Sequence, residues 1–354
     1  MFNINGIRTV NVRIHQDDLQ ALTSHWKHFV DSIPPYPKYF EGKGIVICAG
    51  GKSYFTCCWI LVNILRNEMK SKLPIQVWYM GNEMDNFHIK ILSDLNVVCR
   101  NFLEYNVGQE IKGFAMKPMA ILLSDFKEVI YLDADNTSII DPDILFDLPE
   151  YKRHGAMFWP DFWTTDSSNP IWGIIETPAN DSKEQESGQI LINKEICWKE
   201  LNLALYFNLN KSVYYRLLHG DKDTFRFAWL ALKKEFHFIE YDVASVGFFD
   251  DNKSFIGHTM IQYLPSGQPA FLHRNLIKWD ISDCNICIWN KIKAFTPQSQ
   301  NKRYFTYWDE LRGHPIMNLE GDFELSDFNS QVKLENIEAK CLSYLKYLRV
   351  NFTL

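Results

Sequence analysis

Two aspartates directly after a short apolar run are the residues of this sequence best suited to chemistry. Asp133 and Asp135 follow the apolar residues 129–132, in the order Tyr-Leu-Asp-Ala-Asp-Asn-Thr from Tyr131 to Thr137. A buried strand over 129–132 would deliver both carboxylates into the turn at its carboxyl end, within reach of one hard cation. Such a cation bridges phosphates and stabilises a leaving diphosphate. We expect a metal site here; the alternative is a solvated turn, where Asp is common.

A second candidate is the glycine pair Gly50 and Gly51, which follows the apolar run 44–49. Glycine lets backbone N–H groups approach a nucleotide closely, although an ordinary turn between a strand and a helix gives the same pattern. Lys52 does not turn the pair into a phosphate-binding loop, because the spacing Gly-x-x-x-x-Gly-Lys is absent.

Both candidates lie at the ends of apolar runs in an alternating pattern. Four runs are expected to be strands and three stretches between them helices: 44–49, 75–80, 97–98 and 129–132, and 54–69, 85–95 and 116–124. This alternation predicts an α/β fold, a single Rossmann-like domain with a mostly parallel central sheet flanked by helices. Ligands of such sheets bind beyond the carboxyl ends of the strands, which is where Gly50 and Asp133 lie.

The composition excludes several kinds of partner. The net charge is −6, and the sequence contains no run of basic residues that would contact a phosphate backbone. Nucleic acid is therefore not an expected partner. No stretch approaches the roughly 20 apolar residues of a membrane span, and we expect a soluble chain. The pair Cys284-Asn-Ile-Cys287 has no matching second pair, so structural zinc is not expected.

Six motifs, taken in order, give the chain a family resemblance. They are Gly44-Ile-Val-Ile-Cys-Ala-Gly-Gly51, Phe114-Ala-Met-Lys-Pro118, Val129-Ile-Tyr-Leu-Asp-Ala-Asp-Asn136, Gly155-Ala-Met-Phe-Trp-Pro-Asp-Phe-Trp163, Glu186-Ser-Gly-Gln189 and Gly220-Asp-Lys-Asp-Thr-Phe225. Over about 42–280 the sequence resembles the fungal-type alpha-mannosyltransferases of glycosyltransferase family 71, and it is distantly similar to glycogenin-type retaining transferases. The resemblance implies a GT-A fold, a nucleotide-sugar donor and retention of anomeric configuration. GDP-mannose is favoured, a UDP-hexose is the alternative, and the implied cofactor is Mn²⁺ or Mg²⁺.

The resemblance assigns metal and donor roles to single positions. It implies a metal site of Asp133, Asp135 and His273, and a diphosphate contact from Lys278 in the segment 272–279. Because this segment is one residue shorter than the glycogenin-type pattern, a structural histidine stays open at 273. Lys117 would contact the donor, with a solvated helix lysine as the alternative. The further donor-binding residues are Ala49, Gly50, Gly51, Asp133, Ser187, Gly188, Gln189 and Asp223.

Three residues are expected near the reacting carbon. Glu186 opens a segment that falls where the relatives have Asn-x-Gly, and Asp221 opens Asp-Lys-Asp where they have Asp-Gln-Asp. Lys222 in place of Gln leaves open which group faces the anomeric carbon. Either Asp221 or Glu186 forms a glycosyl-enzyme, or the acceptor hydroxyl attacks on the face that the diphosphate leaves. We favour the second route, because both carboxylates are better explained as binders of sugar hydroxyls.

The aromatic segment 157–163 is the candidate for contacting the acceptor, a glycan or glycoprotein. Trp159, Asp161 and Trp163 would offer flat rings and a carboxylate to a sugar, although core packing explains each ring equally well. We divide the chain into a lead-in at 1–43, a catalytic domain at 44–280 and a C-terminal extension at 281–354. Within the catalytic domain, the nucleotide-sugar half takes about 44–150 and the acceptor half about 151–280.

Two other functions fit parts of the sequence. Asp133-Ala-Asp-Asn-Thr137 satisfies the pattern of haloacid-dehalogenase-type phosphatases, but their nucleophile ends the first strand and three expected strands precede Asp133. A non-catalytic carbohydrate-binding protein is the other alternative, and it has no need for two metal carboxylates beside Lys117, His273 and Lys278. The resembling family is usually Golgi-anchored by an N-terminal helix that we do not find here, so the location stays open, the cytoplasm included.

Overall fold

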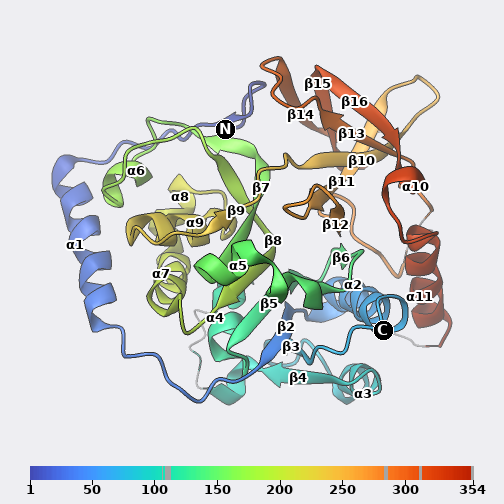
Figure 1. The fold of residues 1–354 in the computed structure, drawn as a ribbon, viewed down its shortest axis with the longest axis horizontal. Helices are drawn as coiled ribbons and strands as arrows, with labels where there is room; N and C mark the ends of the chain where they lie inside the picture. The colour runs from blue at the N-terminus through green and yellow to red at the C-terminus, as the bar shows by residue number, and fades with distance from the viewer. Residues whose placement is uncertain (106, 108–112, 283–285, 311–312, 352–354) are drawn as a thin grey trace.

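The computed structural model describes residues 1–105, 107, 113–282, 286–310 and 313–351, and Cys284 lies outside them. Its centre is a sheet with the strand order β1-β7-β8-β5-β2-β3-β4, to which β9 adds beside β7 (Figure 1). The strands are β1 (Ile7–Arg8), β2 (Lys43–Cys48), β3 (Ile75–Tyr79), β4 (Val97–Asn101), β5 (Glu128–Asp133), β7 (Ala156–Thr165), β8 (Lys183–Asn193) and β9 (His237–Phe238).

The four strands expected from the apolar runs form the parallel half of this sheet. β2 pairs in parallel with β3 and with β5, and β3 pairs in parallel with β4. The register places Cys48 opposite Asp133 on one side and Trp78 on the other, so the carboxyl ends of three strands meet at one edge. β8 runs antiparallel to both β5 and β7, which makes the sheet mixed but mostly parallel, as predicted.

Helices cover both faces of the sheet, because successive residues of a strand point to opposite faces. Ile45 and Ile47 pack into the cluster that holds α2, whereas Val46 packs into the cluster that holds α4 and α7. The longer helices are α1 (Gln16–Ser32), α2 (Gly51–Asn63), α3 (Asn86–Ser93), α4 (Met116–Leu123), α7 (Trp198–Leu209), α8 (Lys211–Leu217), α9 (Lys222–Ala231) and α11 (Ile337–Asn351). The shorter ones are η1 (Ile64–Glu68), η2 (Phe102–Tyr105), η3 (Gly113–Ala115), η4 (Pro142–Asp147), α5 (Pro149–His154), α6 (Ile171–Ile174) and α10 (Phe328–Gln331).

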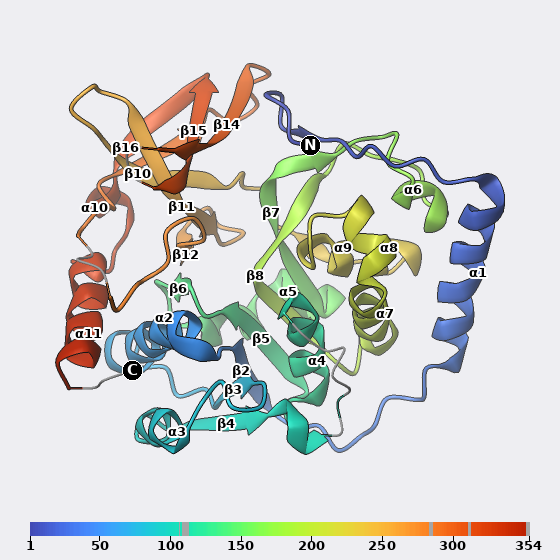
Figure 2. The same ribbon diagram turned by 180° about the vertical axis from the view of Figure 1, so that it is seen from behind.

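A second sheet lies beside the first and connects to it near the candidate site (Figures 1 and 2). β12 pairs with β6, which directly follows the two aspartates, and this places His273 opposite Asn136. The sheet also contains strands from both sides of residue 280, so the expected boundary there runs through a continuous sheet. Its strands are β6 (Asn136–Ser138), β10 (Ala244–Phe249), β11 (Phe255–Tyr263), β12 (Pro269–His273), β13 (Lys291–Phe295), β14 (Lys302–Asp309), β15 (His314–Gly321) and β16 (Phe323–Asp327).

The helix α2 is covered on all sides from Phe55 onward, whereas its first turn, Gly51 to Tyr54, is exposed. Its residues from Phe55 to Asn63 are all buried. One side faces the central sheet and another faces α11, which lies beside α2 in both views (Figures 1 and 2). The Trp59 indole N–H donates to the Tyr344 carbonyl at 3.1 Å, so the chain's last helix closes the core over its second. Among the described residues, no helix has the length and apolarity that crossing a bilayer requires.

Candidate active site

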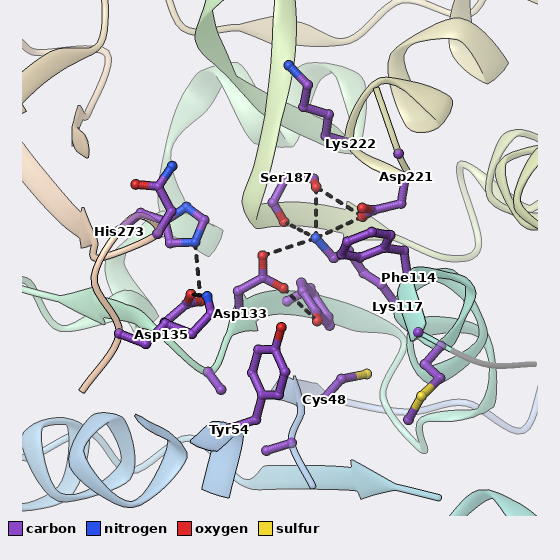
Figure 3. Close-up of a pocket in the computed structure, with 18 of the residues that line it drawn as sticks. Cys48, Tyr54, Phe114, Lys117, Asp133, Asp135, Ser187, Asp221, Lys222 and His273 are labelled. Atoms are coloured by element: carbon purple, nitrogen blue, oxygen red, sulfur yellow. Dashed lines mark hydrogen bonds and ion pairs between the residues drawn. The ribbon is translucent and has the colours of Figure 1, made fainter. Parts of the chain in front are cut away.

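A cavity of about 530 Å³ opens at the carboxyl ends of β2 and β5 (Figure 3). Its lining comes from segments that are far apart in the sequence: the end of β2 and the start of α2, the loop after β3, residues 113–117, the end of β5, the middle of β8 and the turn before α9. The segment after β12 completes it. Representative lining residues are Gly50, Asp133, Glu186, Asp221, His273 and Lys278.

The two aspartates of the sequence motif lie in this cavity and are held differently. Asp133 accepts a hydrogen bond from the Tyr131 hydroxyl at 2.9 Å and one from Lys117 Nζ at 3.1 Å. Asp135 is only 3% exposed; its Oδ1 lies 3.2 Å from His273 Nε2, and its Oδ2 accepts from Lys278. Each carboxylate therefore has a basic partner of its own.

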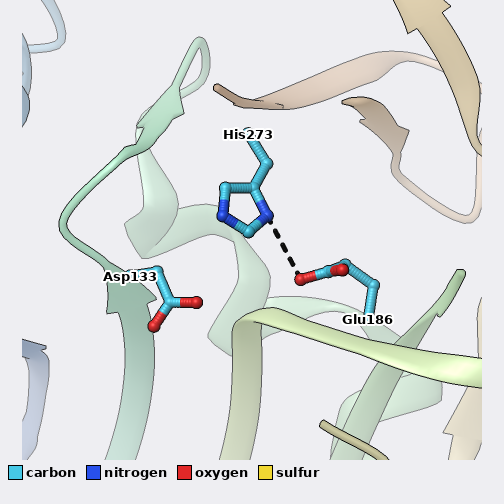
Figure 4. Close-up of side chains that lie close together, drawn as sticks. All are labelled: Asp133, Glu186 and His273. Carbon is cyan, nitrogen blue, oxygen red and sulfur yellow. Dashed lines mark ion pairs between the residues drawn. The ribbon is translucent and has the colours of Figure 1, made fainter. Parts of the chain in front are cut away.

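Three side chains converge in a way that suits a divalent cation. One ligand atom each from Asp133, Glu186 and His273 lie within 4.8 Å of one another (Figure 4). His273 Nδ1 is 3.1 Å from Glu186 Oε1, yet it is buried without hydrogen-bond geometry to any described group. Two carboxylates and an imidazole whose Nδ1 lacks a hydrogen bond form a donor set for Mn²⁺ or a similar ion. Glu186, which we expected near the reacting carbon, belongs to this group, and Asp135, which we expected to bind the metal, contacts its His273.

The electrostatics of this group are strongly coupled. Burial lowers the pKa of His273, but Asp135 and Glu186 outweigh it and raise the pKa to about 10. Burial raises the pKa of Glu186, but His273 outweighs it and brings the pKa to about 2. Burial likewise opposes ionisation of Asp135, yet His273 and Lys278 hold its pKa well below the usual range. A histidine binds a metal ion as the neutral imidazole, so binding of a metal by His273 would release this proton.

Lys117 is not a solvated helix lysine, since its side chain is buried. Its Nζ donates to the Ser187 carbonyl at 2.9 Å and hydroxyl at 2.7 Å, and it lies 2.9 Å from Asp221 Oδ2. With the bond to Asp133, one ammonium group connects β5, β8 and the turn before α9. The Ser187 hydroxyl also donates to Asp221 at 3.2 Å. Lys117 therefore fixes the relative positions of two cavity carboxylates.

Lys222 points away from Lys117 and Asp133 (Figure 3). Its Nζ donates to Asp161 and, at 2.8 Å, to Glu184 Oε2. Burial raises the pKa of Asp161 to about 6, against the attraction of Lys222. Arg8 completes the network, because its Nε lies 2.5 Å from Glu184 Oε1. No pattern in the sequence indicates that the expected lead-in reaches behind the cavity, since Arg8 belongs to no motif.

Several donor-site candidates shape the cavity from behind rather than lining it. A Cβ added at Gly188 would lie 2.6 Å from His273 Nδ1, so the absence of a side chain makes room for the imidazole. Gln189 is fully buried and accepts from Asn136 Nδ2 at 2.7 Å. Asp223 is also fully buried; it accepts from the Gln185 N–H at 2.9 Å and pairs with Arg226 at 2.8 Å. Of the loop residues, Ala49 and Gly50 line the cavity, and Gly51 begins α2 behind them with a φ of 65°.

The structure does not bring the expected acceptor rings to the cavity. Trp159 is fully buried, donates its indole N–H to the Tyr263 carbonyl at 2.8 Å and meets the Phe271 ring edge-on. Trp163 is 9% exposed and packs against Phe2 and Tyr304. Because β7 is an inner strand covered on both faces, its aromatic side chains pack in the core. Of the three acceptor candidates, Asp161 contacts the cavity residue Lys222 with its side chain, and Trp159 lies opposite Glu186 in the pairing of β7 with β8.

Cavity residues that the sequence did not single out include Tyr54, Glu83, His219 and Asn275. Glu83 follows β3 at the same edge of the sheet as Gly50 and Asp133, and that position was the available signal. The other three come from a helix and from irregular segments. Their approach to the cavity depends on the tertiary fold, which spacing does not reveal.

The parallel half-sheet, the antiparallel β8 and the acidic pair at the end of β5 define the GT-A class of glycosyltransferases. A family model for mannosyltransferases, Mannosyl_trans3, matches residues 42–186 and 177–266, more than half of the chain. The chain therefore belongs to this mannosyltransferase family. His273 and Lys278 lie beyond the matched residues.

Individual relatives are similar over part of their length. Alpha-1,2-mannosyltransferase MNN24 of Candida albicans is 30% identical over 60% of this chain and 36% of its own. Alpha-1,2-mannosyltransferase MNN2 of Saccharomyces cerevisiae is 27% identical over 71% of this chain and 51% of its own. The chain thus spans about half or less of these relatives. Among solved structures, the bifunctional glycosyltransferase WbbM has a TM-score of 0.41 and 15% identity, over 56% of this chain and 39% of that chain.

Proposed function

We propose that this protein is a metal-dependent retaining mannosyltransferase that moves mannose from GDP-mannose to a hydroxyl group of a glycan or glycoprotein. The observation that carries the proposal is the convergence of Asp133, Glu186 and His273 in a cavity that Lys278 also lines. Family membership supports mannosyl transfer over phosphatase activity or carbohydrate binding alone.

The metal would be held by Asp133, Glu186 and His273, with Asp135 beside them, and when bound it would neutralise charge on a diphosphate. Lys278 supplies a second positive charge from the same side, since its Nζ contacts Asp135. Lys278 is about one-third exposed on the cavity side, so its ammonium group can exchange Asp135 for a phosphate oxygen. Lys117 keeps Asp133 and Asp221 in place while this exchange occurs.

The contacts of the two candidate nucleophiles favour direct attack by the acceptor. Asp221 accepts from Lys117 and from the Ser187 hydroxyl, and Glu186 lies against His273. A carboxylate held by two donors is a weak nucleophile, because its lone pairs are engaged and its charge is neutralised. Attack by the acceptor hydroxyl on the face that the diphosphate leaves needs positioning and charge stabilisation, which these residues provide.

The position of Glu83 supports a guanine base on the donor. Glu83 lines the cavity from the loop after β3, and its side chain packs against Gly50 at the end of β2, the strand between β3 and β5. A nucleoside diphosphate whose phosphates lie at Asp133 would extend along this edge of the sheet toward Glu83. Its carboxylate accepts from the Met80 N–H at 3.0 Å and has further lone pairs for a ligand. Guanine offers an N–H and an amino group side by side to such a carboxylate, whereas uracil offers one N–H between two carbonyls.

The direct test measures sugar release from GDP-mannose, UDP-glucose and UDP-galactose with Mn²⁺ and no acceptor. We expect GDP-mannose to be consumed fastest. Asp135→Asn should lower the rate about 10²-fold or more, since the proposed metal site loses a carboxylate that contacts both His273 and Lys278. Asp143→Asn, at an exposed position outside the cavity, is the matched control and should keep the wild-type rate. Sugar release that does not depend on Mn²⁺ would remove the metal from the proposal, and full activity of Asp135→Asn would remove Asp135 from the site.

A further inference from the structure

The segment that carries His273 and Lys278 is held together by the arginine between them. The Arg274 backbone N–H donates to the Asp135 carbonyl at 3.0 Å, and its Nε donates to the Ile277 carbonyl at 2.8 Å. The second bond closes the turn between the two functional residues. Arg274 itself is 2% exposed, so its guanidinium group needs a buried partner.

That partner is Glu338 in α11, 64 residues further along the chain. Glu338 Oε1 accepts from Arg274 Nη1 at 3.2 Å, and Oε2 accepts from the backbone N–H groups of Ile288 and Trp289 at 2.8 and 2.7 Å. Glu338 is 5% exposed. The Trp279 ring covers the guanidinium group, with its centroid 3.8 Å from Arg274 Cζ. Water is thus kept from an ion pair that directly adjoins the cavity segment.

We propose that Glu338 is a positioning residue for the active site, acting through Arg274 on His273 and Lys278. The inference rests on the proposed function, since it assigns Glu338 an effect on binding of Mn²⁺ and the donor diphosphate. α11 belongs to the part of the chain that we expected to be a separate extension, and it lies beyond the family match. Outer partners that orient metal ligands change metal affinity by about 10- to 100-fold when they are lost.

The two oxygens of Glu338 do different work, and this permits a selective variant. In Glu338→Gln, the amide oxygen still accepts from Ile288 and Trp289, while the amide NH₂ faces Arg274, which is also a donor. The link to Arg274 is lost and the link to the backbone of 288–289 is kept. Glu68→Gln is the matched control, because Glu68 attaches the same helix through Tyr344 at 2.7 Å and Lys340 at 2.7 Å, away from the cavity.

The experiment measures the dissociation constant of Mn²⁺ with GDP by calorimetry, together with the donor KM, kcat and melting temperature. We expect Glu338→Gln to weaken Mn²⁺–GDP binding about tenfold. Glu68→Gln should lower the melting temperature and leave that affinity unchanged. Adding Glu338→Gln to a His273→Ala, Lys278→Ala protein should weaken binding no further, because the residues through which Glu338 acts are gone.

Equal losses of affinity in Glu338→Gln and Glu68→Gln, or no loss in either, would overturn the positioning role. If Glu338→Gln does not fold, Arg274→Lys decides the question in its place. A lysine keeps the charge beside Glu338 but cannot also hold the Ile277 carbonyl, so the same tenfold loss is expected. A wild-type protein that binds no Mn²⁺–GDP would instead refute the proposed function.

Discussion

Four carboxylates of the cavity each contact a basic side chain. Asp133 and Asp221 share Lys117, and Asp135 and Glu186 share His273, with Lys278 as a further partner of Asp135. Buried charges are tolerated only in such arrangements, since an unpaired ion would pay the full cost of desolvation. A ligand that enters must therefore replace existing partners. A metal ion and a diphosphate together can do so, because the ion takes the carboxylates and the phosphates take the lysine.

At the residue scale, Glu83 is the side chain that we propose distinguishes the base of the donor. Glu83→Gln should weaken GDP binding about tenfold and leave UDP binding nearly unchanged, because one charge-assisted hydrogen bond to guanine is lost. Competition of GDP and UDP against a fluorescent nucleotide, with Mn²⁺ present, measures both affinities on one protein sample.

Glu104→Gln is the control for that substitution, since Glu104 is exposed and lies outside the cavity lining. It should bind both nucleotides as the wild type does. Equal weakening of GDP and UDP in Glu83→Gln would show that Glu83 does not distinguish the bases.

At the scale of elements, the pattern of apolar runs predicted those features of the fold that depend on local sequence. The apolar runs before Gly50 and Asp133 were long enough to define β2 and β5, and alternation with helices made the parallel pairing predictable. The position of Glu186 beside Asp133 was not predictable, because it depends on the antiparallel pairing of β8 with β5. In that register Leu132 lies opposite Gln189, which brings the preceding residues of β8 to the acidic pair. Long-range pairing of this kind leaves no periodic signal in one sequence.

β8 also has to leave space for β12, and Gly188 provides it. Gly188→Ala would place a methyl group 2.6 Å from His273 Nδ1 and 3.0 Å from Glu186 Oε1. We expect Mn²⁺ affinity to fall about 10- to 100-fold, because two proposed ligands must shift apart. Calorimetric titration of Mn²⁺ measures the effect.

Gly173→Ala is the control for this substitution, because it crowds a packed position that lies away from the proposed metal site. Its added methyl would lie 2.8 Å from Leu19 Cδ1, a flexible side chain between α6 and α1. That variant should lose some thermal stability and keep wild-type Mn²⁺ affinity. An unchanged affinity in Gly188→Ala would mean that His273 does not bind the ion where its ring now lies.

At the scale of the whole molecule, both ends of the chain support the cavity. Arg8 in β1 reaches Glu184 behind Lys222, and Glu338 in α11 reaches Arg274 behind His273. Neither residue belongs to a recognisable motif, since each acts by filling a buried position opposite a single partner. Sequence reasoning therefore predicted most of the charged residues that line the cavity and missed those that hold them from a distance.

His273, whose imidazole contacts two carboxylates of the cavity, links the pH to both stability and metal binding. Its pKa rises from the usual 6.5 to about 10 in the folded, metal-free protein, because Asp135 and Glu186 outweigh burial. The raised pKa stabilises the fold fully below pH 6.5, and this contribution is lost as the pH rises through 10. Metal binding has the opposite dependence, since the imidazole must lose its proton first.

We therefore expect the melting temperature with EDTA to fall between about pH 6.5 and 10, and the increase caused by Mn²⁺ to grow over the same interval. Mn²⁺ affinity should rise by up to about tenfold per pH unit while His273 remains protonated in the free protein. Thermal shift across this pH series, with and without Mn²⁺, measures both trends. His273→Asn should flatten the metal-dependent trend, because no proton then competes with the ion, whereas His258→Asn, at a buried histidine outside the cavity, should keep it. A wild-type Mn²⁺ affinity that does not change with pH would mean that His273 is not a ligand of the metal.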